Sequence, residues 1–438
     1  MKKQWILLLA LLLTMSLVVM GCGDDNGEDE NGEEVVGENG EDNDEEEPVD
    51  DDNDADEDDD EEDIDEAAEG DYPNGTYRGI FEDGGEQQVS IQFSVQDGNL
   101  HDVSFRHLYY DGTDYGDLEE GDALYGIYEQ HLQVAEYFEG EPVSSITDLY
   151  EPGDFVDDVD AASGATLRGN KILSAMVDGL NRGLYSPDGD YSIDLPDYQD
   201  GTYRGIYGDS GDQQVSIQFS VEDGSIHDMS FRHLYYGGTD YRDLEEGDAL
   251  YGIYQQHQQI AEYFEGKDLN EITELHNPGD FVDDVDAASG ATLRGNKVYS
   301  AIRDALNRGI YSPANGYSAE LLEDVEDGRY RGTYGDGGEQ QVSVQFNVED
   351  GNIQDLTFRH LYYSGEDYRD VEEGDTLYGI YQQHLQIAEY LEGEPIETIY
   401  DLHNPGDFVE DVDVASGATL RANKVFSAIM NGLSRGIY

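Results

Sequence analysis

The sequence predicts an α+β protein: three tandem small domains, each an antiparallel sheet with two covering helices, after a disordered acidic tether. Two observations predict the repeats. A seven-residue phrase occurs at Asp160–Thr166, Asp286–Thr292 and Asp413–Thr419, and its threonines are 126 and then 127 residues apart. Within each copy, apolar residues first alternate with polar ones, as in strands, and later recur every three or four positions, as in helices.

The first 71 residues are predicted to lie outside any fold. Lys2 and Lys3 precede an apolar run that ends at Met20, which is the pattern of an export signal, so residues 1–21 are assigned to a signal peptide. Residues 23–71 hold 30 Asp or Glu and no Lys or Arg. Their charges repel one another and they have little apolar surface to bury, so residues 22–71 are predicted to form a disordered tether.

Residues 19–22, Val-Met-Gly-Cys, resemble the lipobox of bacterial lipoproteins. The resemblance implies cleavage before Cys22, acylation of its thiol, and an exported protein anchored to the outer face of the cell membrane. An ordinary signal peptide with an incidental cysteine is the alternative. Cys22 is the only cysteine of the chain, so disulfides, cysteine-ligated zinc, iron–sulfur clusters and c-type haem are excluded from the domains.

The rest of the chain is also strongly acidic. Residues 72–438 contain 72 Asp or Glu against 20 Lys or Arg, a net charge of about −52. Self-repulsion of this size destabilises compact domains at low salt, whereas at about 1 M salt the Debye length falls to roughly 3 Å. The composition therefore indicates a saline setting. It argues against nucleic acid as a partner, because no basic surface is available to neutralise phosphates.

The repeated units are predicted to span residues 72–186, 200–312 and 327–438, joined by short acidic segments that begin with proline. In the first unit, the aromatic segment Thr76–Gly79 predicts a strand. Strict alternation over Val89–Val95 predicts a half-buried strand, and Asp97-Gly98 after it predicts a hairpin turn. A third strand is expected through Val103 to Tyr110.

The period then changes to that of a helix. Apolar residues from Leu124 to Phe138 fit one helical face, and Gly140 is expected to end that helix. A loop containing Pro152-Gly153-Asp154 is expected to follow. A second helix is predicted from the apolar positions between Ile172 and Leu180, ending near Gly183.

The seven-residue phrase stands at the start of this second helix, where exposed backbone N–H groups favour a phosphate. Its end, Ser163-Gly-Ala-Thr166, closely resembles the site at which FMN-binding domains receive flavin covalently, and the resemblance covers nearly all of each unit. In that family a transferase joins the FMN phosphate to the hydroxyl of the last Ser or Thr. An ordinary helix cap is the alternative reading of the tetrapeptide. The aspartate before it and its threefold recurrence favour the flavin site.

The resemblance implies up to three FMN groups, each linked covalently through phosphate to Thr166, Thr292 or Thr419. It also assigns cofactor-binding roles to neighbouring residues of each copy, namely Asp160, Ser163, Gly164, Ala165 and Arg168; Asp286, Ser289, Gly290, Ala291 and Arg294; and Asp413, Ser416, Gly417, Ala418 and Arg421. Basic residues are scarce, and all those of the first unit recur in the others: Arg78, Arg106, Arg168, Lys171 and Arg182. Two of these five lie within five residues of the threonine, where a phosphodiester would need them.

No metal site is predicted, because His107 and His131 with their repeats lack a close cluster of ligands and are interpreted as polar members of a strand and a helix. The pair Tyr109-Tyr110 and its repeats are candidates for stacking on a flavin ring, with core packing of one tyrosine in each pair as the alternative. No general base or nucleophile is predicted, and no Gly-x-Gly-x-x-Gly fingerprint follows a strand.

The family resemblance thus implies an electron-transfer flavoprotein rather than an enzyme with its own substrate. Its expected partners are a flavin transferase, a membrane electron donor, and the membrane itself through the lipid anchor. Two alternatives stay open at the level of sequence. One is reversible FMN binding, as in a sensory module. The other is an acidic surface repeat for adhesion or cation binding, without flavin.

Overall fold

The structure is a computed structural model that describes residues 72–110, 112–157, 167–283, 294–314, 322, 325–363, 365–375, 377–410 and 421–438. All of these residues belong to one compact unit, Glu62–Tyr438. The predicted signal peptide, Cys22 and the tether lie outside the described residues, as do all three copies of the seven-residue phrase.

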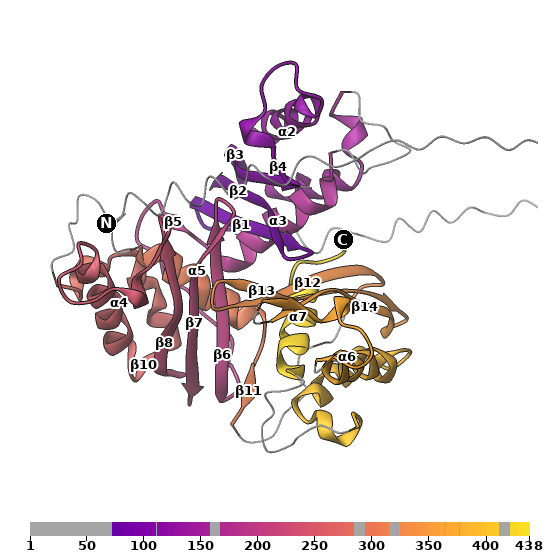
Figure 1. The fold of residues 1–438 in the computed structure, drawn as a ribbon. Coiled ribbons are helices and arrows are strands. Elements are labelled where there is room, and N and C mark those ends of the chain that lie inside the picture. Colours follow the sequence, from indigo (N-terminus) through magenta and orange to yellow (C-terminus); the bar gives the residue numbers. More distant parts are fainter. Residues whose placement is uncertain are drawn as a thin grey trace, which may run out of the picture. The chain divides into compact units, whose positions relative to one another are not determined.

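Each repeat contains an antiparallel sheet built on three long strands (Figure 1), so the predicted α+β class is confirmed. The first sheet has the order β4-β3-β2-β1-β5, with β1 Gly75–Asp83, β2 Glu86–Gln96, β3 Asn99–Tyr110, β4 Thr113–Asp114 and β5 Ser186–Pro187. The second contains β6 Gly201–Asp209, β7 Asp212–Glu222, β8 Ser225–Tyr236, β9 Thr239–Asp240, β10 Lys267–Asp268 and β11 Ser312–Pro313. The third contains β12 Gly328–Asp336, β13 Glu339–Glu349, β14 Asn352–Tyr363 and β15 Glu366–Asp367.

Two α-helices accompany each sheet, as predicted. They are α2 Tyr125–Tyr137 and α3 Gly169–Arg182, α4 Tyr251–Phe264 and α5 Gly295–Asn307, and α6 Tyr378–Leu391 and α7 Ala422–Ser434. The segment around Pro152, expected as a loop, instead forms the 3-10 helices η3 Val143–Tyr150 and η4 Pro152–Asp154. The other 3-10 helices are η2 Tyr115–Asp117, η5 Tyr241–Asp243, η6 Leu269–His276, η7 Pro278–Asp280, η8 Tyr368–Asp370, η9 Ile396–His403 and η10 Pro405–Asp407. Within the described residues, no helix combines the length and the apolar character that a membrane span requires.

The predicted hairpin turns are confirmed. Asp97 and Gly98 have φ angles of 52° and 80°, and the same pair recurs with positive φ at Asp223-Gly224 and Asp350-Gly351. Two consecutive positive φ angles define the tight hairpin turn that fits the twist of paired strands. Each turn therefore fixes the pairing of the second and third strands in its repeat.

The second helix of each repeat, which is α3, α5 or α7, lies directly on the first strand of its sheet. A Cβ atom added to Gly79 of β1 would lie 1.8 Å from the carbonyl oxygen of Ala175 in α3. Gly205 and Gly332 make the same close approach to α5 and α7. This close packing fixes the position of each of the three helices on its sheet. It therefore also fixes the residues at the helix N-terminus, which follow the repeated phrase in the sequence.

The prediction of a half-buried second strand is wrong for its first part. Ser90, on the face expected to meet solvent, is only 3% exposed. The equivalent serines of the other two repeats show the cause of this burial. Ser216 Oγ donates a hydrogen bond to Asp336 of the third repeat, and Ser343 Oγ donates one to Asp83 of the first. The adjacent repeat covers the second face of the strand.

Buried charges join the three helices α3, α5 and α7. Arg182 in α3 binds Asp178 in the same helix (Nε–Oδ2 2.7 Å) and Asp304 in α5 (Nη2–Oδ1 2.8 Å). Arg435, which caps the C-terminus of α7, reaches Asp178 at 3.4 Å. Arg308, which caps the C-terminus of α5, donates a hydrogen bond to the Thr333 carbonyl oxygen of the third repeat. Each repeat thus contacts the other two through buried side chains, and the described residues of all three belong to one compact unit.

Candidate functional site

An arginine with unusual backbone geometry precedes each of the helices α3, α5 and α7. Arg168 has φ 61° and ψ 47°, and Arg294 and Arg421 share this left-handed conformation. An L-residue there costs about 1 kcal/mol relative to glycine, so its occurrence in all three repeats indicates a constraint on these side chains. In each repeat the guanidinium lies over the ring of a tyrosine, 3.0 Å from the Tyr110 centroid and 3.1 Å from that of Tyr236. Arg421 makes the same contact with Tyr363.

A buried lysine follows one turn into each helix. Lys171 donates a hydrogen bond to the Gln88 side chain and lies 5.0 Å from the Tyr110 ring centroid. Burial, reinforced by the charge of Arg168, lowers the pKa of Lys171 to about 7. The same environment lowers the pKa values of Lys297 and Lys424 to about 7.

Two arginines of the preceding repeat complete the basic cluster. Arg106 of the first repeat binds Asp209 of the second with a pair of hydrogen bonds, Nε–Oδ1 at 2.7 Å and Nη2–Oδ2 at 2.8 Å. Arg78 approaches the same carboxylate at 3.3 Å, and Lys297 lies 4.0 Å from it. Burial raises the pKa of Asp209, but the hydrogen bonds and charges of Arg106 and Arg78 outweigh it and hold that pKa below its usual value.

This pairing of one repeat with the next closes on itself. Arg204 and Arg232 of the second repeat bind Asp336 of the third. Arg331 and Arg359 of the third repeat bind Asp83 of the first, Arg359 through two hydrogen bonds of 2.7 and 2.8 Å. The arginine pairs therefore reach from first repeat to second, second to third, and third back to first.

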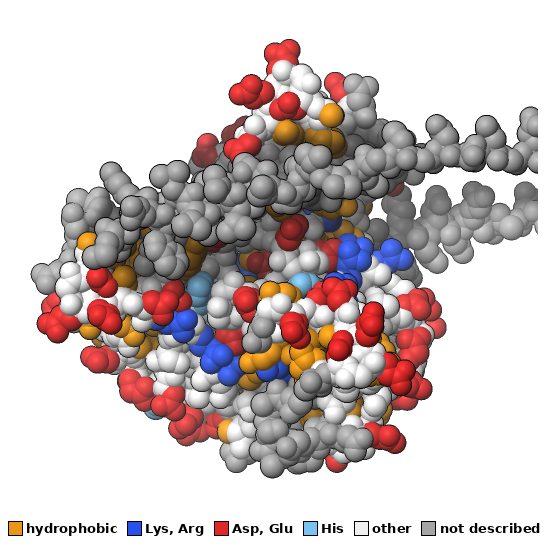
Figure 2. Space-filling view, viewed as in Figure 1, with side chains coloured by type: hydrophobic (Ala, Val, Ile, Leu, Met, Phe, Trp, Pro, Cys, Tyr) orange, Lys and Arg blue, Asp and Glu red, His pale blue; other side chains and the backbone are white. Residues whose placement is uncertain are grey.

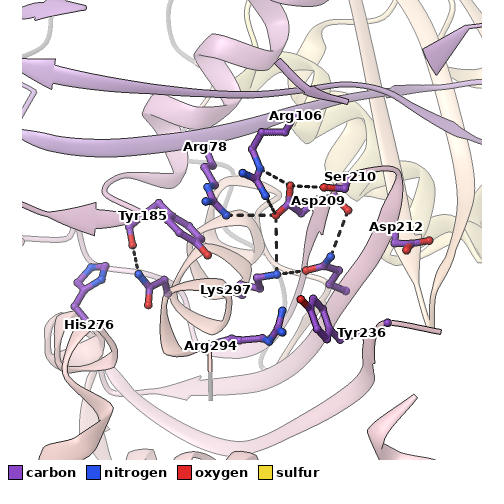
Figure 3. A pocket seen from close by; sticks show the side chains of 13 residues that line it. Arg78, Arg106, Tyr185, Asp209, Ser210, Asp212, Tyr236, His276, Arg294 and Lys297 are labelled. Atoms are coloured by element: carbon purple, nitrogen blue, oxygen red, sulfur yellow. Dashed lines mark hydrogen bonds and ion pairs between the residues drawn. The ribbon is translucent and has the colours of Figure 1, made fainter. Parts of the chain in front are cut away.

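An open pocket of about 730 Å³ lies at the contact of the first and second repeats (Figure 3). It is lined by Arg78, Arg106, Tyr185, Asp209, Ser210, Asp212, Gln214, Tyr236, Gly237, His276, Arg294, Asn296 and Lys297. In Figure 3, Arg78 and Arg106 point toward Asp209 from one side and Lys297 from the other. The walls thus come from both repeats, and Arg294 links the pocket to the segment that contains Thr292.

A related pocket of about 520 Å³ lies at the contact of the third and first repeats. Its lining residues occupy equivalent positions in the repeat: Asp83, Gly84, Gln88, Tyr110, Arg168, Asn170, Lys171, Arg331, Arg359 and Tyr438. At the contact of the second and third repeats, Arg204, Arg232, Asp336 and Arg421 make the corresponding interactions. The same cluster is therefore built three times.

Each cluster carries a local excess of positive charge in a very acidic protein. Asp209 is surrounded by Arg78, Arg106 and Lys297, and Arg294 lines the same pocket. On the face in Figure 2, acidic side chains dominate the described surface and basic ones gather in a few places. Like charges brought together in this way repel one another, so an anion is the ligand that would stabilise the cluster.

The predicted site residues divide into two groups. Arg168 and Arg294 lie in the pockets, and Arg421 occupies the equivalent position in the third repeat. The predicted attachment threonines and the Asp, Ser, Gly and Ala before them lie outside the described residues. Sequence reasoning assigned no role to Arg78 or Arg106, because their partner Asp209 is more than a hundred residues away. Their recurrence among so few basic residues was the one signal that pointed to them.

The histidines have structural environments. His131 in α2 is buried, its Nδ1 lies 2.7 Å from the Ile127 carbonyl oxygen, and burial lowers its pKa to about 4. His107 packs against the next repeat, 3.0 Å from where a Cβ on Gly211 would lie. The described part of the chain contains no group of three His, Cys, Asp or Glu side chains that would hold a metal ion. These residues therefore build the core and the contacts between repeats.

Tyr110 and Tyr363 are partly buried and pack against the core, whereas Tyr236 is exposed. Tyr109 stacks on His107 with ring centroids 5.6 Å apart, whereas Tyr110 lines a pocket beneath Arg168. Each cluster thus combines guanidinium groups, a lysine, a helix N-terminus and an aromatic ring, which together suit a phosphate-bearing ligand with a flat ring. Comparison of the chain with protein families, with curated proteins and with solved structures gave no match.

Proposed function

We propose that this protein is an extracytoplasmic electron carrier that holds FMN on Thr166, Thr292 and Thr419. The observation that carries the proposal is the basic cluster next to each repeated phrase. Arg168 and Arg294 stand two residues after the first two threonines and line pockets that contain two further arginines and a lysine. Such a cluster favours a phosphate through charge-assisted hydrogen bonds and the partial positive charge of a helix N-terminus.

The chain's own residues supply attachment and surroundings. Each attachment would form a bond between a threonine Oγ1 and the phosphorus of FMN. A separate transferase would catalyse it from a donor that carries this phosphate in a pyrophosphate bond, which breaks as the donor's second phosphate leaves with the threonine proton. Arg168 and Lys171 would offset the negative charge of the phosphodiester, and Tyr110 offers an aromatic face nearby. FMN, when bound, supplies the electron transfer, which no side chain here provides.

The proposal includes the setting of the protein. Acylation of Cys22 anchors the mature chain to the outer face of the cell membrane, and the acidic tether holds the repeats away from the surface. A membrane donor reduces the flavins, and an external or partner acceptor oxidises them. A covalent link suits this location, because a cofactor released outside the cell is lost.

Reversible FMN binding is the second candidate. The observation that favours it is the pocket of about 730 Å³ between the first and second repeats, whose basic groups would hold a phosphate without a covalent bond. The two candidates differ in what happens on unfolding, because only an esterified flavin stays with the denatured chain.

The attachment is tested by replacing all three threonines with alanine in cells that supply FMN and a flavin transferase. The triple variant is expected to carry no flavin after denaturation and gel filtration, measured by absorbance near the flavin band. A matched triple Thr→Ser variant keeps a hydroxyl at each position and is expected to retain the flavin. Flavin that remains on the denatured alanine variant would place the attachment elsewhere in the chain.

A further inference from the structure

The basic groups around each pocket come from two repeats in a fixed order. At the pocket between the first and second repeats, the helix N-terminus contributes Arg294 and Lys297, whereas Arg78 and Arg106 come from the preceding repeat. At the pocket between the third and first repeats, Arg331 and Arg359 take the places of Arg78 and Arg106. One repeat supplies the arginine and lysine that follow its predicted attachment threonine in the sequence. The repeat before it supplies the other two of the four basic side chains.

The arginines retain donors for a ligand. Arg106 uses Nε and Nη2 for Asp209, and Arg78 uses Nε for Gln92 and Nη1 for Asp209. Each guanidinium has five N–H donors, so Nη1 of Arg106 and Nη2 of Arg78 remain without a hydrogen bond among the described residues. Asp209 thus orients both arginines without using all of their hydrogen-bonding capacity.

The preceding repeat also forms a wall of the pocket. Asn296, in the first turn of α5, donates a hydrogen bond of 2.6 Å to the carbonyl oxygen of Tyr185 in the first repeat. The Tyr185 ring lies 3.9 Å from the guanidinium carbon of Arg78. The junction of the third and first repeats has the same contact between Arg331 and the ring of Tyr438, the last residue of the chain.

The charges of the two repeats act on each other. Burial is the main cause that lowers the pKa of Lys171, and Arg168 of the same repeat adds to it. Arg331 and Arg359 of the third repeat lower that pKa further. Positive groups from both repeats therefore face the same pocket, and a bound anion would neutralise their charges.

We infer that each pocket is a phosphate site shared by two consecutive repeats, in which the arginine pair of one repeat binds the ligand phosphate attached to the next. The order is cyclic: Arg106 serves the site of Thr292, Arg232 that of Thr419, and Arg359 that of Thr166. The identity of the ligand as FMN rests on the proposed function, whereas the sharing of the site rests on the contacts between repeats. The first flavin therefore depends on the last repeat.

Three single variants test the order: Arg106→Gln, Arg232→Gln and Arg359→Gln. Each is produced with the transferase for a limited time, and mass spectrometry of peptides measures the flavin on each threonine. Loss of a charge-assisted hydrogen bond weakens binding by about tenfold or more. The expected result is a fall of this size in the early rate of attachment at Thr292, Thr419 and Thr166 respectively, with the other two threonines unchanged.

Matched controls separate this effect from misfolding. Arg242→Gln removes an arginine that pairs with Asp240 of its own repeat, outside the pockets, and should change no threonine. Arg106→Lys keeps the charge beside Asp209 but loses the paired hydrogen bonds, so it should retain the fold and show an intermediate loss at Thr292. Urea midpoints verify that the variants are folded.

Sulfate provides a second readout that does not depend on flavin. In protein made without the transferase, calorimetry is expected to give three sulfate sites for the wild type and two for each Arg→Gln variant. Loss of flavin at the variant's own repeat, an equal loss at all three threonines, or no loss would overturn the shared site. Absence of sulfate binding by the wild type would overturn it as well. If the wild type carried no flavin but bound three sulfate ions, the proposed function would be refuted and the shared phosphate site would stand.

Discussion

Three buried lysines show how much a single residue depends on its surroundings. Lys171, Lys297 and Lys424 lie in the N-terminal turns of α3, α5 and α7, where burial and neighbouring arginines lower each pKa to about 7. An unfolded lysine keeps its usual pKa, so between about pH 7 and about pH 10 the unfolded chain binds more protons than the folded one. The contribution of these lysines to the free energy of unfolding therefore rises with pH across this range.

The pH dependence can be measured against a variant that lacks one of the lysines. In flavin-free protein, the free energy of unfolding of the wild type should rise relative to Lys171→Met by up to about 1 kcal/mol per pH unit between about pH 7 and about pH 10. Urea titrations at several pH values provide the comparison, and Lys267→Met, at a partly buried lysine paired with Glu271, is the control. Parallel curves for wild type and Lys171→Met would refute the lowered pKa.

At the scale of elements, the contact between β1 and α3 is the most restrictive in each repeat. Replacing Gly79 with alanine would place a Cβ within 2.4 Å of two backbone atoms of α3, the Ala175 carbonyl oxygen and the Gly179 nitrogen. Backbone atoms of a packed helix cannot move aside as a flexible side chain does, so Gly79→Ala is expected to lower the free energy of unfolding by about 3 kcal/mol or more.

A glycine in a helix gives the opposite expectation. Gly126 in α2 has no neighbour within 4 Å of an added Cβ, and its φ is not positive. Gly126→Ala should therefore raise the free energy of unfolding by about 0.5–1 kcal/mol, because alanine favours the helix and restricts the unfolded chain. Urea denaturation of the two variants gives the test. A similar, small change in both would mean that α3 does not lie on β1 as described.

The strands, turns and helices were predictable because their signals are local. The alternation from Val89 to Val95 and the Asp97-Gly98 pair depend on neighbours in sequence, and the structure has a strand and a hairpin turn at these positions. The burial of Ser90 was not predictable, because the contacts that cover this face of a sheet come from another repeat, far along the chain, as in the hydrogen bond between Ser343 and Asp83. The same limit applied to the site. Arg168 was predicted as a site residue because it stands two residues after Thr166 in the sequence, whereas Arg106 was not, because its partner Asp209 is far along the chain.

At the scale of the whole molecule, departures from the repeat pattern offset one another. Arg182, Arg308 and Arg435 meet among α3, α5 and α7. The third repeat has Asn431 where the others have Asp178 and Asp304. The first repeat has Glu82 where the others have glycine, and this buried carboxyl faces the same three arginines. Burial raises the pKa of Glu82, and Arg435, Arg308 and Arg182 oppose that rise. Three carboxyl groups thus accompany three guanidinium groups, although no single repeat holds the complete set.

The net charge makes stability depend on salt. Residues 72–438 carry about 52 net negative charges, and raising sodium chloride from about 0.1 M to about 1 M shortens the Debye length from about 10 Å to about 3 Å. Screening of this repulsion should outweigh the weakening of exposed ion pairs, so the urea midpoint should rise with salt. Chloride is preferred to sulfate, which would also bind the pockets. A midpoint that falls with added salt would mean that attractive ion pairs dominate.

The most direct test of the account is the intact mass of the denatured mature protein, produced with a flavin transferase and exported. The account predicts a mass above that of the lipidated polypeptide by three FMN groups less three waters, because all three repeats contain the same cluster beside the repeated phrase. An unchanged mass, from cells in which the transferase modifies a known acceptor, would contradict it.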